Sequence, residues 1–534
     1  MSTERFGRRG FLKTAGMIAP GVVIGANAPI LAAQNTTGAK PAEVLNVIAF
    51  GAKGDGTSID SPVINRAIDS AAEAGGGTVY FPAGNYLCYS IRLKSKVSLY
   101  FERGATVIAA DPAADAAQSY DAAESNKPWE GYQDYGHNHW HNSLIWGEGL
   151  DGVSICGSGK IWGKGLSRGW GAGPKAEDPG VANKAIALKN CRNVLLRDFS
   201  ILHGGHFGIL ATGVDNFTID NLTIDTNRDG MDIDCCRNVH VSNCSVNSPW
   251  DDGICLKSSF ALGYARATEM VTITNCLVAG SFEEGALLDG TFKRFAADEK
   301  VPRTGRIKFG TESNGGFKNI TISNCVFEGC NGLAIESVDG AVIEDVTCSN
   351  ITMRDLYGAP IFVRLAARMR EPAEAKVGTI RRVMLSNFTC RNAADSKAIS
   401  SIVAGIPGHA IEDLKISDVI VMHSGGGTKE DAARRLEEKE KDYPEPTMFG
   451  RTPSQGFFVR HVKGLEMEGI RIQRASEDAR PAFVLEDVDG AEFGRIKTQP
   501  GAPMFALEKV HDFSVYRSKP VPDTELAVVE KKEI

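Results

Sequence analysis

The sequences N-F-T-I-D-N at residues 216–221 and N-V-H-V-S-N at residues 238–243 carry the pattern that decides the fold. Apolar and polar residues alternate between two asparagines, which is typical of a β-strand with one buried face. Similar segments begin at residues 193, 270, 319, 382 and 413. A strand pattern that returns after about 20–25 residues predicts a β-solenoid, with one repeat in each coil. A leucine-rich repeat has a similar period, but β-branched residues outnumber leucine here and the fixed leucine pattern is missing.

Residues at the ends of the repeats are predicted to stack from coil to coil. The asparagines that close the repeats can then hydrogen-bond to one another along the solenoid. Four cysteines follow an asparagine at the same place in a repeat: Cys191, Cys244, Cys276 and Cys325. We therefore predict that they are small buried core residues and that most of the cysteines are unpaired. The Cys-x-x-Cys spacing of a zinc site is absent.

The composition is that of a soluble protein with a large core. The chain has 534 residues, of which 43% are hydrophobic and 23% charged, and its formal net charge is −7. Length alone would suggest several domains, but a repeat architecture overrides that expectation. The mild acidity and the absence of a basic stripe argue against nucleic-acid binding.

The N-terminal residues 1–33 are predicted to be a twin-arginine signal peptide. Arg8 and Arg9 precede an apolar run at residues 15–33, which ends in small residues. Prolines and an asparagine interrupt the run, which argues against a membrane anchor. We expect export to the periplasm or secretion, with no membrane contact after signal removal, and a linker at residues 34–44.

Residues 45–519 are predicted to form one solenoid domain, with an N-terminal cap and the first coils at 45–110. A glycine-rich segment at 45–56 and a helix at 61–74 precede the first strands. The segment lacks the Gly-Lys-Ser/Thr of a phosphate loop, so we interpret it as the cap over the end of the core.

Three insertions are predicted to leave the solenoid at residues 111–143, 281–304 and 425–450. In the last, a charged run reaching residue 442 is predicted to form a short exposed helix, with Thr428 and Asp431 as a capping box. The tail at 520–534 is expected to be irregular and to cap the C-terminal end.

The first insertion is rich in aromatic residues and histidines. Trp140 either contacts sugar or packs within a folded rim. His137, His139 and His141 alternate, which raises the alternative of a metal site. Because no carboxylate or cysteine completes an evident ligand set, we predict no metal and no cofactor.

Five aspartates gather in residues 227–258: Asp229, Asp232, Asp234, Asp251 and Asp252. Asp229 and Asp251 lie 22 positions apart, about the length of one coil. Equivalent positions of adjacent coils stack at roughly 4.8 Å, so the carboxylates should form a compact cluster. Close carboxylates cannot all ionise freely, and a carboxylic acid beside a carboxylate is what the hydrolysis of a glycosidic bond requires.

Three motifs resemble those of glycoside hydrolase family 28, the polygalacturonase and rhamnogalacturonase family. N-R-D-G at 227–230 is similar to the family's Asn-Thr-Asp-Gly, and D-D-G-I-C-L-K-S at 251–258 is similar to its Asp-Asp-x-Ile-x-x-Lys-Ser. G-T-E-S-N-G-G at 310–316 is similar to a third coil of the family. The resemblance runs from about residue 45 to about residue 493. It implies an all-β, right-handed parallel β-helix of the pectate-lyase-like type and an inverting hydrolase.

The resemblance also implies the roles of individual residues. Asp251 would be the general acid, and Asp229 and Asp252 would activate the attacking water, whereas Asp232 and Asp234 are interpreted as structural. The residues predicted to bind substrate are Asn227, Lys257, Arg306, Lys308, Glu312, Glu336, Arg364, Arg368, Trp140 and Tyr443.

Two departures from the family pattern affect the expected substrate. Thr304-Gly305-Arg306 stands where family polygalacturonases carry Gly-His-Gly, and Ala334-Ile335-Glu336 stands in place of their Arg-Ile-Lys. Glu336 would repel a uronate, so we predict a neutral sugar such as rhamnose at that subsite, or that Arg306 and Lys308 bind the anion. Arg364 and Arg368 either clasp a neighbouring uronate or form a surface cluster.

The sequence therefore predicts a monomeric glycosidase that acts on pectic polysaccharide or oligosaccharide. Loop lengths and the resemblance suggest exo action on a rhamnogalacturonan-type chain. Two alternatives remain open. One is a lyase on the same fold that uses Ca²⁺ held by the aspartates, and the other is a non-catalytic β-helix that binds carbohydrate.

Overall fold

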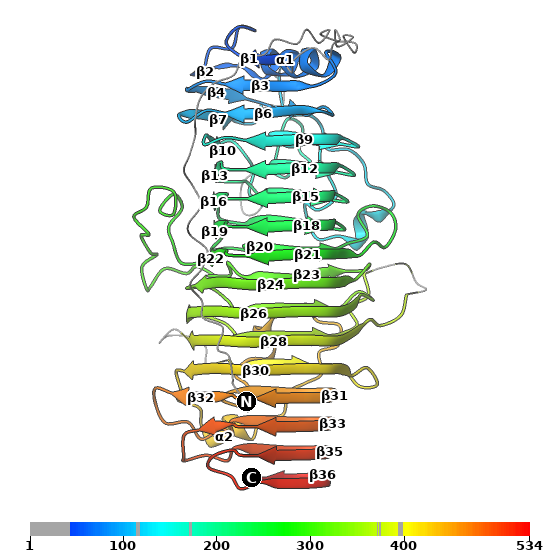
Figure 1. Ribbon diagram of the computed structural model, residues 1–534, viewed down its shortest axis with the longest axis vertical. Helices are drawn as coiled ribbons and strands as arrows, with labels where there is room; N and C mark the ends of the chain where they lie inside the picture. Colours follow the sequence, from blue (N-terminus) through cyan, green and yellow to red (C-terminus); the bar gives the residue numbers. More distant parts are fainter. Residues whose placement is uncertain (1–42, 114–117, 170–173, 371, 373–374, 393–398) are drawn as a thin grey trace, which may run out of the picture. The chain divides into compact units, whose positions relative to one another are not determined.

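The computed structural model describes residues 43–534, apart from 114–117, 170–173, 371, 373–374 and 393–398. The predicted signal peptide and nearly all of the predicted linker lie outside the described residues. None of the helices in the described part of the chain has the length and hydrophobicity needed to span a bilayer. The strands stack in sequence order along the chain (Figure 1).

Each coil in the central part of the chain contributes three strands, one to each of three faces. The central coil consists of β17 (Asp229–Asp234), β18 (Arg237–Ser242) and β19 (Ser245–Asn247). β17 pairs in parallel with β14 (Phe207–Thr212) of the preceding coil and with β20 (Ile254–Ser258) of the next. The predicted parallel β-helix is therefore confirmed.

The first face carries the residues discussed below. Its strands are β5 (Ile91–Arg92), β8 (Ile145–Glu148), β11 (Lys184–Lys189), β14, β17, β20, β23 (Ile307–Ser313), β25 (Leu333–Ser337), β27 (Ile361–Leu365), β29 (Ser401–Ala404) and the first halves of β31 (Phe457–Glu468), β33 (Phe483–Gly494) and β35 (Phe505–Tyr516).

The other two faces are built in the same way and merge in the later coils. The second face contains β1 (Glu43–Asn46), β3 (Gly77–Phe81), β6 (Val97–Phe101), β9 (Asp151–Cys156), β12 (Arg192–Arg197), β15 (Asp215–Asp220), β18, β21 (Thr268–Thr274), β24 (Phe317–Glu328), β26 (Val342–Leu356), β28 (Thr379–Asn392) and β30 (Ile411–His423). The third contains β2 (Asp55–Ile59), β4 (Gly84–Cys88), β7 (Ala105–Ala109), β10 (Lys160–Trp162), β13 (Ser200–Leu202), β16 (Thr223–Asp225), β19, β22 (Leu277–Ala279), β32 (Arg471–Arg474) and β34 (Lys497–Thr498). In β24, β26, β28 and β30 one long strand runs through both faces, as shown by the pairing of β24 with both β21 and β22. After β30 the third face again has separate strands, β32 and β34.

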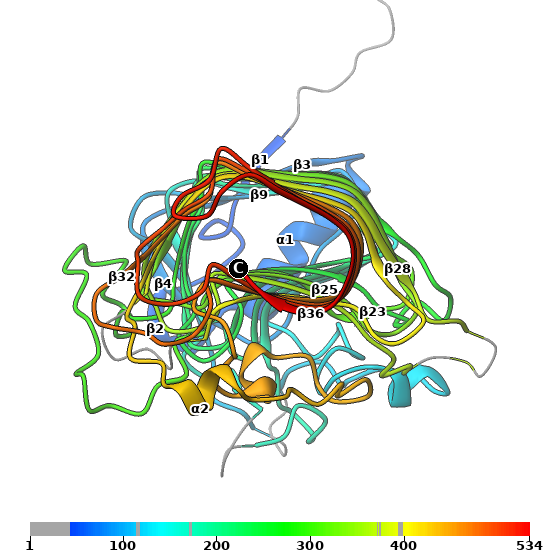
Figure 2. The ribbon, with the colours of Figure 1, turned by 90° about the horizontal axis from the view of Figure 1, so that it is seen from below.

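One continuous hydrophobic core fills the interior of the coils. Alternate residues of each strand point inward, as in β18, where Val239 and Val241 are buried and the residues between and around them are more exposed. α1 (Ser61–Glu73) closes the N-terminal end with four buried apolar residues, Ile64, Ala67, Ile68 and Ala71. Figure 2 shows this helix across the space that the coils enclose. The predicted cap helix is confirmed.

The predicted asparagine ladders are confirmed. Asn216 donates to Asn193 and Asn238 donates to Asn216, each at 2.9 Å, and all three have a positive φ between 53° and 56°. Asparagine tolerates this left-handed conformation better than most residues, so it can both turn the chain and bond to the next coil. A second ladder joins Asn243, Asn275, Asn324, Asn350 and Asn387.

The prediction that the cysteines are buried and unpaired is also confirmed in the described residues. Cys191, Cys244, Cys276 and Cys325 are buried free thiols, and eleven of the twelve cysteines are buried. The thiols of Cys244, Cys276 and Cys325 each donate to the carbonyl oxygen two residues earlier, at 3.2–3.3 Å. They act as small apolar core residues.

The prediction for the charged run after Thr428 is only partly correct. The capping box between Thr428 and Asp431 is present, but α2 (Lys429–Ala432) ends long before residue 442. The following carbonyl groups instead accept hydrogen bonds from buried arginines: Leu436 and Glu437 bind Arg460, and Glu438 and Lys439 bind Arg364. A continued α-helix would have used these carbonyls internally.

The prediction of an irregular tail is wrong. β36 (Thr524–Glu533) is a regular strand that pairs with β35 and runs antiparallel to it, unlike every other pairing between named strands in the described chain. A further excursion from the coils between β10 and β11, described at residues 163–169 and 174–183, was not predicted.

Candidate active site

A pocket of about 890 Å³ opens beside the N-terminal ends of β17 and β20 on the first face. Its walls are mostly charged, polar and aromatic. It is lined by Asp134, Tyr135, His137, Arg168, His206, Asn227, Arg228, Asp229, Trp250, Asp251, Asp252, Lys257, Pro302, Thr304, Lys308, Tyr443 and Glu445. Its size lies within the range usual for small-molecule sites.

The three aspartates of the two sequence motifs meet in this pocket. Asp229 begins β17, and Asp251 and Asp252 lie in the turn that leads into β20. One oxygen from each lies within 4.8 Å of the other two. The glycine after Asp229 permits this stacking, because a Cβ on Gly230 would come within 2.4 Å of the Gly253 carbonyl oxygen.

The environment gives these carboxyl groups opposite charge preferences. Burial raises the pKa of Asp229 well above its usual value, and the neighbouring charges of Asp251 and Asp232 raise it further. Burial also acts to raise the pKa of Asp252, but Lys308 and Arg306 outweigh it, and that pKa is lowered. Asp229 therefore favours the protonated form and Asp252 the ionised form.

Arg228 lies between Asp251 and a histidine. Its Nη2 donates to Asp251 Oδ2 at 2.6 Å and lies 3.2 Å from His206 Nε2. Burial lowers the pKa of His206 well below its usual value, and the charge of Arg228 lowers it further. His206 is thus a neutral imidazole in the free protein.

A buried ion network supports the floor of the pocket. Lys257 Nζ lies 3.3 Å from Glu312 and 3.8 Å from Asp232, and both carboxylates are fully buried. Glu312 also binds His137 Nδ1 and accepts a hydrogen bond from the Asp134 amide at 2.8 Å. This carboxylate therefore fixes the first insertion onto β23.

A second network holds Asp252 from the other side. Arg306 Nε donates to Asp252 at 2.8 Å and also binds Glu445. Lys308 Nζ lies 3.4 Å from Asp252 and 3.7 Å from Glu336. Burial raises the pKa of Glu336 to about 8, even though Lys308 and Arg306 oppose that shift.

The structure brings together part of the predicted substrate-binding set. Asn227, Lys257, Lys308 and Tyr443 line the pocket with the three aspartates. The ring of Tyr443 is held near Lys308 and Arg368, and its hydroxyl is hydrogen-bonded by Thr311 Oγ1 at 2.8 Å. Arg306 is buried behind Asp252, outside the lining.

Two predicted substrate ligands, Glu312 and Glu336, lie beneath the pocket surface. Both are fully buried and neither lines the pocket. Glu336 stands behind Lys308, so the prediction that Glu336 itself faces a sugar is wrong. Asp234 is structural, because its carboxylate accepts two hydrogen bonds from Ser259, at 2.8 and 2.6 Å.

The remaining three predicted ligands contact protein groups instead of the pocket. Trp140 is fully buried against Phe207 and Leu210 and donates to Thr212 Oγ1 at 3.1 Å, so it cannot stack on a sugar. Arg368 is held by both oxygens of Asp339. Arg364 is fully buried and donates to four carbonyl oxygens, so the prediction that it clasps a uronate is wrong.

Arg364 has a structural role that a substitution can test. Arg364 donates to the carbonyl oxygens of Gly405 (2.9 Å) and Glu438 (2.7 Å), and so connects the end of β29 with the third insertion. Arg364→Met removes both hydrogen bonds. Buried carbonyls left without donors cost about 1–3 kcal/mol each, so we expect a loss of about 3 kcal/mol in a urea unfolding curve. The exposed Arg381→Met should cost less than about 0.5 kcal/mol. A weaker substrate affinity with unchanged stability would contradict this role.

Several residues of the pocket were missed from the sequence. Arg228 and Trp250 stand inside the quoted motif region, so their place beside the aspartates could have been noticed. His206 lies one coil before Asp229, at the turn into β14. Asp134, Tyr135, His137, Arg168, Pro302, Thr304 and Glu445 come from loops whose direction no repeat pattern predicts.

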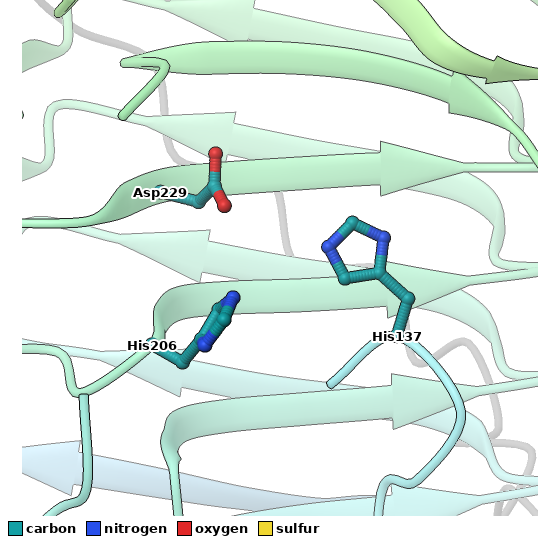
Figure 3. A group of neighbouring side chains, drawn as sticks. All are labelled: His137, His206 and Asp229. Carbon is teal, nitrogen blue, oxygen red and sulfur yellow. The ribbon is translucent and has the colours of Figure 1, made fainter. Parts of the chain in front are cut away.

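The clusters of potential metal ligands differ from the predicted alternative. His139 binds the Glu124 carbonyl and His141 lies 2.8 Å from Glu148, so neither joins His137. His137 instead meets His206 and Asp229, and one nitrogen or oxygen atom of each lies within 4.8 Å of the other two (Figure 3). Asp229, Asp251 and Asp252 form the other such group in the described chain.

Comparison with known protein families supports the β-helix class that the fold and these motifs indicate. Residues 44–144 match the family "Rhamnogalacturonase A/epimerase, pectate lyase-like", and residues 142–262 match the family "Right handed beta helix region". The chain is thus a right-handed, pectate-lyase-like parallel β-helix protein. The matches also support the resemblance to the polygalacturonases, glycoside hydrolase family 28.

The similar proteins point the same way. A probable polygalacturonase of Vitis vinifera is 23% identical over 341 residues, which cover 59% of this chain and 61% of that protein. The chain therefore spans less than two thirds of that relative. The family 28 exopolygalacturonase of Yersinia enterocolitica aligns with a TM-score of 0.60 and 18% identity over 84% of this chain and 78% of its own. The exopolygalacturonase of Thermotoga maritima aligns with a TM-score of 0.58 and 18% identity over 81% and 92%. At these identities, the solved structures establish the fold.

Proposed function

We propose that the protein is a glycosidase that hydrolyses pectic polysaccharides or oligosaccharides from a chain end. The observation that supports this most is the convergence of Asp229, Asp251 and Asp252 in a pocket of about 890 Å³. Within this cluster one carboxyl group favours its acid form and another its ionised form. Such a pair supplies both proton transfers that glycoside hydrolysis needs. The polygalacturonase relatives support the same class of reaction.

In the proposed mechanism, a proton held by the Asp229–Asp251 pair protonates the leaving oxygen, and the ionised Asp252 activates water. The resemblance assigns the donating acid to Asp251, which lies next to Asp229. Carboxyl groups this close titrate as a unit, so the proton on Asp229 in the free chain remains available to the pair. The nearest carboxyl oxygens lie within 4.8 Å of one another, so the roughly 6.5–9.5 Å spacing usual for inverting enzymes lends no support, and inversion is a proposal from the resemblance.

The cations of the pocket support an anionic sugar. Lys257, Lys308, Arg168 and Arg228 all line it. The ammonium group of Lys308 lies close to Asp252. Lys308 belongs to β23, one coil before the strand in which the family has Arg-Ile-Lys and this chain has Ala334-Ile335-Glu336. Glu336 is fully buried behind Lys308 and does not line the pocket, so it would not repel a uronate bound there. We propose that Lys308 receives the uronate carboxylate of a rhamnogalacturonan-type or polygalacturonan-type chain.

The walls of the pocket support action at a chain end. On one side, the carboxylate of Asp134 accepts a hydrogen bond from Arg370, and the backbone N–H of Asp134 donates to Glu312. On the other side, Tyr443 is hydrogen-bonded to Thr311, and Glu445 binds Arg306. Both walls come from insertions that fold over the first face, and a groove closed in this way would admit a chain terminus. Export by the twin-arginine pathway remains part of the proposal.

Product analysis tests this function. The purified chain is incubated separately with polygalacturonan and with rhamnogalacturonan oligosaccharides, and products are separated by chromatography while proton NMR follows the first anomer released. We expect one monosaccharide or short unit from the chain end, with an inverted anomeric configuration, and none from the Asp251→Asn variant.

Other outcomes would favour the competing classes. An unsaturated product that absorbs ultraviolet light, formed only when Ca²⁺ is present, would indicate a lyase. Oligosaccharides that bind to the wild type without any turnover would indicate a carbohydrate-binding β-helix. Mixed internal fragments would retain the hydrolase and contradict the exo action.

A further inference from the structure

The cluster of His137, His206 and Asp229 has a donor set that metal ions prefer. Two imidazoles and one carboxylate, with one atom from each within 4.8 Å of the others, converge from the first insertion, the turn before β14 and the start of β17 (Figure 3). Imidazole nitrogen and carboxylate oxygen together suit Zn²⁺ and related transition metals. Zinc-ligand distances of about 2.0–2.2 Å require the three atoms to close slightly around the ion, which side-chain rotation allows.

The surroundings of His137 match those of a metal ligand. Its Nδ1 contacts the buried carboxylate of Glu312, and this contact directs Nε2 toward the cluster. Metal-binding histidines commonly have such a carboxylate on the other ring nitrogen, which fixes the tautomer and the ring orientation. With Nδ1 as the donor to Glu312, Nε2 presents a lone pair.

A second, independent observation is the buried carboxylate of Asp232. Neither of its oxygens accepts a hydrogen bond from the described residues, although the side chain is fully buried. Oδ2 lies 3.7 Å from His137 Nε2 and 3.8 Å from the Lys257 ammonium, which balances its charge but donates no hydrogen bond to it. A metal ion in the cluster, or a water bound to that ion, would supply the missing partner.

The charges around the cluster leave room for a divalent cation. The carboxyl groups of Asp232, Asp251 and Glu312 outnumber the two cations that pair with them, Lys257 and Arg228.

We propose that His137, His206 and Asp229 form a site for a divalent transition metal such as Zn²⁺ at the floor of the pocket. The three side chains coordinate the ion, and one coordination position remains open toward Asp232. Since one ligand is Asp229, the bound metal withdraws that carboxylate from proton transfer and inhibits hydrolysis reversibly. Metal binding is independent of the proposed function, whereas the inhibition rests on it.

Arg228 limits the affinity of this site and provides a sharp test. Its Nη2 donates a hydrogen bond to His206 Nε2 at 3.2 Å, so a metal ion that binds this nitrogen must displace that hydrogen bond and is repelled by the guanidinium charge. Arg228→Gln removes this charge and should tighten Zn²⁺ binding by at least about ten-fold. Misfolding would expose buried thiols that also bind Zn²⁺, so the gain supports the site only if the variant still binds one ion per chain and unfolds as the wild type does.

Titration calorimetry of the metal-free full chain with Zn²⁺ alone measures the binding. We expect one ion per chain, with an affinity that falls by about 10–100-fold or more in His137→Ala and His206→Ala and by about 10–100-fold in Glu312→Gln. The visible absorption of bound Co²⁺ should disappear in the two histidine variants. His141→Ala is the matched control, because His141 belongs to the same insertion but contacts Glu148, and it should bind as the wild type does.

The inference is overturned if the wild type binds no Zn²⁺, or if it binds equally well after either His137 or His206 is replaced. A wild type that hydrolyses pectic chains equally well with the site filled would overturn the inhibitory role alone. If no hydrolysis is found at all, the calorimetric and Co²⁺ results still decide the metal site, so the two proposals fail separately.

Discussion

Asp251→Asn and Asp252→Asn are each expected to lower kcat by about 10²–10⁴-fold, with little change in KM. A positioned acid or base contributes a factor of this size, and asparagine keeps the shape of the side chain but can neither give nor take the proton. Asp229→Asn should lower kcat in the same range. In the proposed mechanism the Asp229–Asp251 pair shares the proton that is given to the leaving oxygen, and asparagine at position 229 cannot hold that proton. Initial rates on the substrate found by product analysis, together with thermal unfolding, measure both effects.

Asp234→Asn provides the matched control for these variants. Asp234 belongs to the same strand, β17, but is held by Ser259 and does not line the pocket. Its replacement should leave kcat within a few-fold of the wild type in the chain that remains folded. A kcat that survives in Asp251→Asn and Asp252→Asn would remove these carboxyl groups from the chemistry.

Glu336→Gln is expected to make the protein more stable than the wild type as the pH rises. The pKa of Glu336 is raised from 4.5 to about 8 in the folded chain, because burial outweighs the opposing charges of Lys308 and Arg306. Between these two values the folded state keeps a proton that the unfolded state releases. Wild-type stability therefore falls with increasing pH, by up to about 1.4 kcal/mol for each pH unit in that window.

The glutamine variant does not titrate, so its advantage should be absent below pH 4.5 and largest above about pH 8. Urea unfolding midpoints of both proteins at several pH values measure this difference. Glu437→Gln, at a side chain that is 83% exposed, should show a flat difference across the same range. An advantage that grows toward acid pH would contradict the burial of an uncharged Glu336.

The fold could be predicted because its signals are local and repeated. Each coil carries its own alternating strands and a turn asparagine, as at Asn216 and Asn238, so a single period describes the whole solenoid. The tail could not be predicted this way. The polar residues of β36 resemble a loop in the sequence, and only its pairing with β35 makes it a strand.

The candidate site was predicted where it depends on the coil period and missed where it depends on loops. Asp229 and Asp251 are one coil apart, so stacking alone brings them together. The direction in which an insertion folds is decided by distant contacts, such as the one between His137 and Glu312, 175 residues later. Arg364 and Trp140 were assigned to substrate because their side-chain types suit sugars, but the sequence does not say that carbonyl groups and apolar side chains already surround them.

The reversed strand β36 covers an edge that the coils would otherwise leave open, because it pairs with β35. An unpaired β35 would offer its backbone N–H and C=O groups to strands of another molecule, and such edges lead to aggregation. β36 blocks this contact because it occupies that edge, and its own outer edge carries charges, among them Glu530, Lys531, Lys532 and Glu533. A chain that lacked β36 would leave the backbone edge of β35 unpaired, and we expect it to self-associate more readily at high concentration.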